Sequence, residues 1–175
     1  MFSDPNYVVE QLDLQSGSKV ADFGVGSGFY SLALSKAVGD NGKVYAVDVQ
    51  KGLLETLKNE TNRRRAFNVE FVWGDIEKEG GSHLADDSLD AVVIVNVFFQ
   101  IVEKKKVISE IKRVLKKNGQ VLIVDWSESF GGLGPTEESV VSEFEIKKLF
   151  EAENFVFYKK VSAGDHHFGI ILKKQ

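Results

Sequence analysis

Strand-length apolar runs alternate with segments of helical periodicity over most of this 175-residue chain. The run that follows Asp90 is continuously apolar, as expected for a central parallel strand that is buried on both faces. The expected strands cover 19–23, 43–48, 69–73, 90–95 and 121–124, and the expected helices cover 31–38, 52–65 and 102–117. This alternation predicts right-handed crossovers and a doubly wound α/β fold, in which helices cover both faces of a mostly parallel sheet.

The pattern changes near residue 126. Residues 126–139 are rich in Gly and Ser, and we expect them to form a mobile lid loop. A helix is expected over 137–153, followed by strands at 155–161 and 168–173 whose short connection predicts an antiparallel hairpin. Residues 1–17 are interpreted as a short N-terminal helical segment, and the whole chain, 1–175, as one domain.

Composition excludes several kinds of site. Apolar residues make up 43% of the chain, enough to bury a core, and the net charge of −4 makes binding to nucleic-acid phosphates unlikely. The absence of cysteine excludes disulfides, zinc–thiolate sites and a cysteine nucleophile. No signal peptide is recognisable, and the most apolar stretch, 91–99, is shorter than the roughly 20 residues of a membrane span. We therefore expect a cytoplasmic protein without a membrane span, whose oligomeric state stays open.

A glycine loop follows the first expected strand and opens the first expected helix. Its pattern is Asp22-x-Gly24-x-Gly26-x-Gly28, and such glycines permit a tight turn and let a ligand lie against the backbone. A dinucleotide fingerprint needs glycine or alanine where this chain has Phe29. Asp22 would repel a pyrophosphate but can pair with an ammonium group. A plain structural turn is the competing interpretation of the loop alone.

Two further acids end the next two strands. Asp48 lies 20 residues beyond Gly28, where a carboxylate can accept hydrogen bonds from ribose hydroxyls. Asp75 ends the third strand and can accept the adenine amino group, while Ile76 packs on the ring. Taken alone, an Asp at a strand end is more often a helix cap than a ligand-binding residue. Their combination with the glycine loop at one edge of a parallel sheet favours a site for an adenosine that carries a cationic tail.

These motifs resemble those of class I S-adenosylmethionine (SAM)-dependent methyltransferases. Residues 20–28 look like the first motif of that family, 44–48 like its acidic motif, 74–76 like its adenine-binding motif, 89–100 like its fourth-strand motif, and 115–124 like the approach to its fifth strand. The resemblance covers roughly residues 15–125, and the terminal hairpin also fits. It implies SAM as the cofactor and a seven-stranded sheet of order 3-2-1-4-5-7-6 with the last inserted strand antiparallel.

The resemblance also implies roles for individual residues. The methionine part of the cofactor would be held by Asp22, Gly24, Gly26 and Gly28, the ribose by Asp48, the adenine by Val49, Asp75 and Ile76, and the region of the methyl group by Asn96. Two departures stand out: Asn118 replaces a proline that is frequent in the family, and only some 17 residues precede the first strand. Many relatives carry a longer helical lid there, so substrate recognition is the part least determined by the resemblance.

Methyl transfer is an in-line displacement that depends mainly on positioning. Candidate catalytic residues are Asp125, at the end of the fifth strand, and His166, before the last strand; candidate acceptor contacts are Phe99, Trp126 and His167. The structural alternatives are a loop cap for Asp125 and a solvated turn for the histidines. The basic run 63–65 is interpreted as a helix end, where cations suit the helix dipole, and the runs 104–106 and 112–113 as a solvated helix face. No full set of metal ligands is apparent.

The leading hypothesis is a methyltransferase that acts on a small-molecule or lipid-like acceptor. A protein or RNA methyltransferase and an inactive SAM-binding scaffold are the alternatives. A nucleotide-dependent oxidoreductase ranks below them, because Phe29 and Asp22 argue against it. The sequence Asn96-Val97-Phe98-Phe99 lacks the prolines of an Asn/Asp-Pro-Pro-Tyr motif. The sequence therefore gives less support for methylation of adenine or of a glutamine amide.

Overall fold

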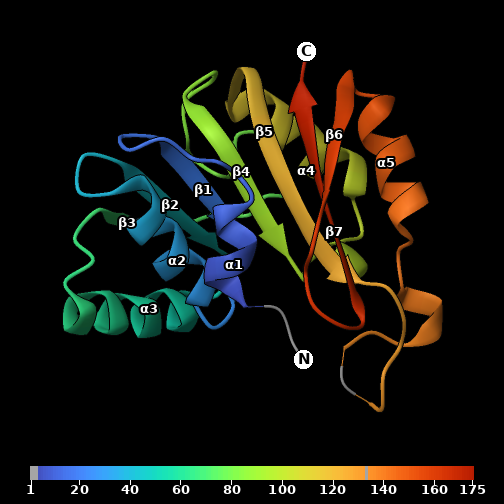
Figure 1. Ribbon diagram of the computed structural model, residues 1–175, viewed down its shortest axis with the longest axis horizontal. Helices are drawn as coiled ribbons and strands as arrows, with labels where there is room; N and C mark the ends of the chain where they lie inside the picture. The colour runs from blue at the N-terminus through green and yellow to red at the C-terminus, as the bar shows by residue number, and fades with distance from the viewer. Residues whose placement is uncertain (1–3, 133) are drawn as a thin grey trace.

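The computed structural model describes residues 4–132 and 134–175. Within them a seven-stranded sheet has the order β3-β2-β1-β4-β5-β7-β6, and β7 runs antiparallel to both of its neighbours (Figure 1). This arrangement confirms the predicted fold and strand order. The parts of the predicted N-terminal segment and lid loop that fall on 1–3 and 133 lie outside the described residues.

The strands follow the apolar runs of the sequence. Ala91, Val92, Val93 and Ile94 of β4 are fully buried because helices cover both faces of the sheet at its centre. The strand bounds are β1 Lys19–Phe23, β2 Lys43–Asp48, β3 Val69–Trp73, β4 Leu89–Val95, β5 Leu115–Trp126, β6 Phe155–Val161 and β7 His167–Lys174.

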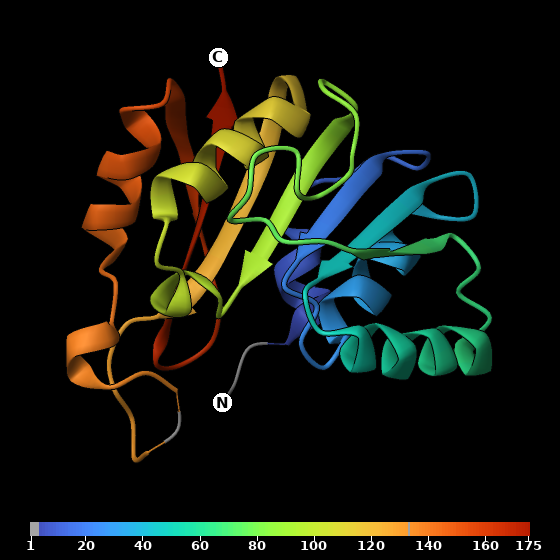
Figure 2. The same cartoon turned by 180° about the vertical axis from the view of Figure 1, so that it is seen from behind.

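Helices form a layer on each face of the sheet. α1 (Pro5–Glu10), α2 (Phe29–Val38) and α3 (Lys51–Arg64) lie on one face (Figure 1). α4 (Lys104–Val114) and α5 (Glu143–Glu151) cover the other, which faces the viewer in Figure 2. The core is accordingly split into two clusters by the sheet.

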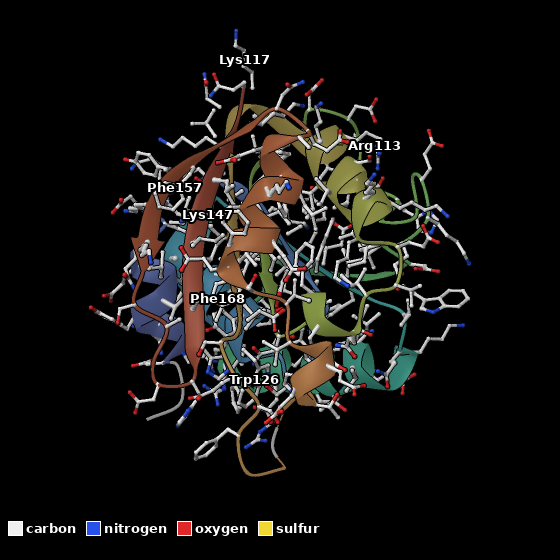
Figure 3. All side chains as sticks on the ribbon, turned by 90° about the vertical axis from the view of Figure 1, so that its right-hand side faces the viewer. Arg113, Lys117, Trp126, Lys147, Phe157 and Phe168 are labelled. Atoms are coloured by element: carbon white, nitrogen blue, oxygen red, sulfur yellow. The ribbon has the colours of Figure 1, made fainter. Side chains whose placement is uncertain are left out.

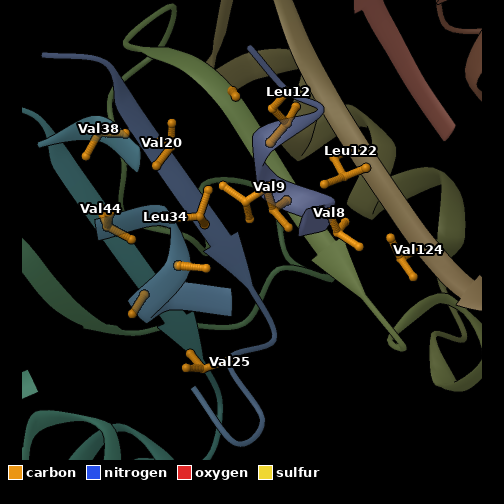
Figure 4. Packing of buried hydrophobic residues seen from close by; sticks show 14 of the residues in the cluster. Val8, Val9, Leu12, Val20, Val25, Leu34, Val38, Val44, Leu122 and Val124 are labelled. Carbon is orange, nitrogen blue, oxygen red and sulfur yellow. The ribbon is translucent and has the colours of Figure 1, made fainter. Parts of the chain in front are cut away.

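The short helix α1 seals the first of these clusters. Pro5 suits its first turn, and the side chain of Asp4 accepts a hydrogen bond from the backbone N–H of Asn6 at 3.0 Å. Its apolar side chains Val8 and Val9, and Leu12 just after it, point towards the sheet in Figure 4, and all three are buried. In Figure 4 the helix lies in front of β4, between β1 and β5, and it packs beside α2 on the same face of the sheet.

The boundary between α4 and β5 differs from the prediction of a helix over 102–117. The helix ends at Val114, and the strand already begins at Leu115, which pairs with Leu89 of β4. The next register pair joins Ala91 to Gln120, so residues 116–119 bulge out of the ladder. Asn118 adopts a positive φ of 64° in this bulge, a conformation that asparagine tolerates better than most residues. Asn118 and Gly119 therefore lie inside the strand rather than ending a helix.

The predicted helix over 137–153 is also wrong in extent. A single 3₁₀ turn, η2 (Glu137–Ser139), is followed by extended backbone at Val140, and α5 starts only after Ser142. Ser142 and Glu145 form a reciprocal capping box, which marks a new helix N-terminus.

The prediction of a solvated helix face at 112–113 is wrong for Arg113. This side chain pairs with the buried Glu110.

Candidate functional site

The glycine loop leaves β1 in a conformation that requires glycine. Gly24, Gly26 and Gly28 have φ values of 84°, 50° and 79°, all in the left-handed region. The backbone N–H of Gly24 donates to the carbonyl of Val47 at 2.9 Å, which ties the loop to the end of β2. A Cβ atom on Gly24 would stand 2.5 Å from the side chain of Val97, so the loop also packs closely against the segment after β4.

Asp22 precedes this loop and is buried, with 1% of its surface exposed. Its Oδ2 accepts a hydrogen bond from the hydroxyl of Ser31 on α2 at 2.6 Å. Burial raises the pKa of Asp22 to about 7; the nearby charge of Asp48 adds to this, and the hydrogen bonds from Ser31 oppose it. A buried carboxyl group of this kind gains from a cationic partner, which would stabilise its ionised form.

Asp48 is the last residue of β2, and Asp75 lies in the turn after β3. One carboxylate oxygen of each side chain closes a local turn. Oδ1 of Asp48 accepts from the backbone N–H of Gln50 at 2.8 Å, and Oδ1 of Asp75 accepts from that of Glu77 at 3.0 Å. Within the described residues, no side chain hydrogen-bonds to Oδ2 of Asp48, whereas Oδ2 of Asp75 meets Lys78 at 3.2 Å. The cap and the ligand-binding interpretations are therefore compatible, because a carboxylate has two oxygens.

A cavity of about 420 Å³ opens at the carboxyl ends of β1 to β4. Its volume lies in the range typical of small-molecule and cofactor sites. The residues predicted for cofactor binding that line it are Asp22, Gly24, Gly26, Asp48, Val49, Asp75, Ile76 and Asn96. Gly28 is not among the lining residues; a Cβ atom there would stand 2.6 Å from the side chain of Leu57, so this glycine lets α2 approach α3.

Asn96 stands directly after β4 with a positive φ of 55°. Its backbone N–H donates to the carbonyl of Val124 at 2.8 Å, which places it beside the end of β5. Its Oδ1 is buried and accepts no hydrogen bond from the described part of the chain. A buried acceptor without a partner is costly unless a ligand or water satisfies it. The atom therefore fits a ligand-binding role in the cavity.

Several lining residues were not singled out from the sequence. Tyr30 and Leu53 come from the starts of α2 and α3, while Glu77, Gln100 and Ile101 close the cavity between the β3–β4 loop and the segment before α4. Their proximity to the recognised motifs is the one signal that the sequence contained. Side-chain direction in loops has no periodic pattern, so the sequence did not distinguish these residues from their neighbours.

The predicted catalytic residue Asp125 lies outside the set that lines the cavity. It is 1% exposed, and its Oδ1 accepts the N–H of Trp126 at 2.8 Å. Burial raises the pKa of Asp125 to about 6, against the opposing effect of the backbone amides of Trp126, Phe98 and Phe99. Oδ1 of Asp125 thus caps the backbone at the end of β5, as in the structural alternative considered for it, whereas its Oδ2 is buried and accepts no hydrogen bond from the described residues beside the 3₁₀ turn η1 (Phe98–Gln100).

The two histidines and Trp126 form a separate group at the end of β5 and the start of β7. His166 contacts Glu128 through Nδ1 and stacks on Phe130, with ring centroids 3.8 Å apart. His167 lies 4.3 Å from the ring of Trp126, and its Nε2 is buried without a partner in the described chain. Figure 3 shows Trp126 at the end of the sheet from which the 126–139 loop leaves. The structure therefore brings these residues together with each other and not with the cavity.

Phe99, the remaining predicted acceptor contact, lies in η1 and is partly buried; its neighbour Phe98 is fully buried in the core. Phe99 is not among the cavity-lining residues either. Among residues 4–132 and 134–175, no group of three acidic or histidine side chains is arranged to hold a metal ion. In the same residues, no helix is both long and apolar enough to cross a membrane.

The comparisons with known proteins agree with this geometry. A family model described as a methyltransferase domain matches residues 14–168. The crystal structure of a SAM-dependent methyltransferase from Aquifex aeolicus is 32% identical with a TM-score of 0.89, and the match covers 99% of this chain and 91% of that one. The ubiquinone/menaquinone biosynthesis C-methyltransferase UbiE of Pseudomonas entomophila is 28% identical over 152 residues, which are 86% of this chain and 54% of the relative.

Human arsenite methyltransferase is 35% identical over 112 residues, which are 61% of this chain and 30% of that protein. The chain thus spans about half the length of the UbiE relatives that it matches. The family model covers most of the chain, and the Aquifex aeolicus structure matches it almost from end to end. The chain therefore belongs to the class I SAM-dependent methyltransferase family, whose cofactor is SAM.

Proposed function

We propose that this chain transfers a methyl group from SAM to a small-molecule or lipid-like acceptor. The observation that carries the proposal is the set of groups around one cavity: Asp22, Asp48 and Asp75 at successive strand ends, and the unpartnered Oδ1 of Asn96. These groups complement an ammonium, a pair of ribose hydroxyls and an adenine amino group, which are the polar features of SAM. The UbiE and arsenite methyltransferases among the relatives also bear the names of small-molecule reactions.

Bound SAM supplies an electrophilic methyl group on a sulfonium. Asp22 would pair with the ammonium of the methionine part, and the backbone at Gly24 and Gly26 would hold that part. Asp48 would accept hydrogen bonds from the ribose hydroxyls, while Asp75 and Ile76 would hold the adenine. Asn96 lies where the end of β4 meets β5 and orients the reacting region. Catalysis then rests on alignment within a partly desolvated pocket, with no covalent enzyme intermediate.

The acceptor side of the proposal lies towards the ends of β5 and β7. Asp125 and His166 are the proposed proton acceptors there, and Phe99, Trp126 and His167 form the proposed acceptor wall. The 126–139 loop is the proposed lid. It is held by the His166–Glu128 contact and by Gly134, where a Cβ atom would stand 2.4 Å from the Trp126 ring.

Titration calorimetry distinguishes this function from dinucleotide chemistry. We expect SAM and S-adenosylhomocysteine to bind at one site per chain, and NAD not to bind, because Asp22 opposes a pyrophosphate and Phe29 replaces the third glycine of a dinucleotide loop. Binding of NAD but not of SAM would overturn the proposed function. Screening of small-molecule extracts with methyl-labelled SAM then identifies the acceptor, and label found in protein or RNA would favour the alternative substrates.

Cofactor affinity is expected to depend on pH through Asp22. The carboxyl group is protonated below its raised pKa of about 7, and the ammonium of S-adenosylhomocysteine pairs only with the ionised form. Affinity should therefore fall as the pH decreases, and be roughly 20-fold weaker near pH 5.5 than near pH 7.5. Adenosine lacks the ammonium and is the control ligand, and Asp22→Asn is the control variant. An equal pH dependence for both ligands would contradict the role of Asp22.

A further inference from the structure

A buried carboxylate on α4 holds the loop that carries the adenine side of the cavity. Glu110 is 2% exposed, and it accepts hydrogen bonds from the backbone N–H groups of Gly80 at 3.0 Å and Ser82 at 3.1 Å, and from the Ser82 hydroxyl. Arg113, one turn further along the helix, donates to the same carboxylate from Nε at 2.9 Å and from Nη2 at 2.7 Å. A buried charge is tolerated when it is paired and hydrogen-bonded in this way.

Arg113 completes the cluster on the outer side. It also donates to the carbonyl of Leu84 at 2.8 Å and contacts Asp86. Against the opposing effect of burial, hydrogen bonds from Arg113 and Ser82 lower the pKa of Glu110 to about 2, so its carboxylate stays ionised throughout the neutral range. The acceptor needed by the two loop amides is therefore present at any pH where the cofactor is studied.

The loop transmits this constraint to the cavity through backbone contacts. Gly81 lies between the two residues whose amides Glu110 binds, and its carbonyl accepts the N–H of Asp75 at 3.0 Å. A Cβ atom on Gly74 would stand 2.3 Å from the Gly81 oxygen, and one on Gly81 would stand 2.0 Å from the Asp75 oxygen. The two arms of the loop are in direct backbone contact, so Asp75 cannot shift without displacing Gly81.

A second carboxylate joins the same loop to α4, but here the carboxylate is on the loop and the amides that it binds lie just before the helix. Oε2 of Glu77, on the loop, accepts from the N–H groups of Val102 at 3.2 Å and Glu103 at 2.9 Å, immediately before α4 begins. Glu77 lines the cavity, and so does Ile101, the residue before Val102. The loop and α4 are therefore joined at two points, and the cavity lies beside the second of them.

We propose that Glu110, together with Arg113, is a positioning residue for the cofactor site: it fixes the 74–82 loop so that the Asp75 carboxylate meets the adenine amino group. Glu110 touches no ligand itself and acts through the Gly81–Asp75 backbone contact. This inference rests on the proposed function, since it assumes that Asp75 accepts the adenine amino group. A carboxylate that merely stabilised the fold would affect unfolding without changing how the site distinguishes one purine from another.

The test is a comparison of S-adenosylhomocysteine with the analogue that lacks the adenine 6-amino group, by titration calorimetry on folded full-length protein. For Glu110→Gln we expect roughly tenfold weaker binding of S-adenosylhomocysteine and little change for the analogue. In an Asp75→Ala background the same substitution should have no further effect on either ligand. Asp86→Asn, which removes only the exposed partner of Arg113, is the matched control and should bind both ligands as the unaltered chain does.

Ser82→Ala is the milder variant if Glu110→Gln fails to fold. It removes the hydroxyl donor and leaves both backbone bonds to Glu110, and we expect a loss of about threefold for S-adenosylhomocysteine alone. Equal losses for the two ligands, additive losses with Asp75→Ala, or unchanged affinity in a folded variant would each overturn the positioning role. Failure of the unaltered chain to bind S-adenosylhomocysteine would instead overturn the proposed function on which the inference rests.

Discussion

Asp48→Ala is expected to weaken the binding of S-adenosylhomocysteine by roughly 10- to 100-fold, equivalent to about 1–3 kcal/mol. The side chain stands at the carboxyl end of β2 with Oδ1 engaged by the N–H of Gln50, and it lines the cavity. Its removal leaves the ribose hydroxyls of the ligand without an acceptor at a position where the side chain is only 8% exposed. Titration calorimetry at constant pH and ionic strength measures the change.

Two variants separate this effect from a loss of charge. Asp48→Asn keeps an oxygen for the Gln50 amide, so it should retain the local turn and lose less affinity than the alanine variant. Asp40→Ala removes the same charge from the exposed turn before β2, at the opposite end of that strand, and should leave affinity unchanged. Wild-type affinity in a folded Asp48→Ala protein would rule out the ribose role of this carboxylate.

Phe150→Ala should lower the free energy of unfolding by about 3–5 kcal/mol, the range for a large aromatic side chain removed from a packed core. Phe150 is fully buried on α5. Its ring meets Phe98 at a centroid distance of 5.8 Å and Phe155 at 5.1 Å, both edge-on. The substitution therefore leaves a cavity between α5, β6 and η1, and the change is measured by urea denaturation.

The same helix supplies the control. Phe144 is 74% exposed, and Phe144→Ala should change the free energy of unfolding by less than about 0.5 kcal/mol. Phe98 belongs to η1, which follows Asn96 and Val97 of the cavity, so Phe150→Ala should also weaken cofactor binding modestly in the protein that remains folded. Equal destabilisation by both substitutions would show that Phe150 does not have the core role described here.

The extent of agreement between sequence and structure differs from element to element. The strands β1, β2 and β3 were predicted with their observed bounds, because a short apolar run between turn residues has one way to be buried in a parallel sheet. The end of α4 was missed, since Leu115, Lys116 and Lys117 continue the helical pattern of the residues before them. Pairing of Leu115 with Leu89 decides their conformation, and that partner is 26 positions away in the sequence.

The candidate site shows the same division. The glycines and the three acids Asp22, Asp48 and Asp75 could be recognised from the sequence. Their spacing places them at strand ends, and the strand ends of a parallel sheet converge on one edge. Asp125 was placed at the correct strand end, yet it alternates with Val121 and Ile123 of the core cluster beneath α4, and it does not line the cavity. The alternation of side chains along a strand assigns residues to two faces, and it does not say which face meets the ligand.

By itself the sequence determined the doubly wound sheet, its strand order through the family resemblance, and the carboxylates and glycines gathered at the carboxyl ends of the first three strands. These follow from local periodicity and from chemistry that repeats at regular places in the fold. Only the tertiary structure decided that Gly28 serves helix packing, that His166 and Trp126 belong to a loop contact, and that Glu110 and Glu77 join α4 to the 74–82 loop. Those roles depend on contacts between residues 20 or more positions apart, whose geometry exists only once the sheet and its helices have packed together.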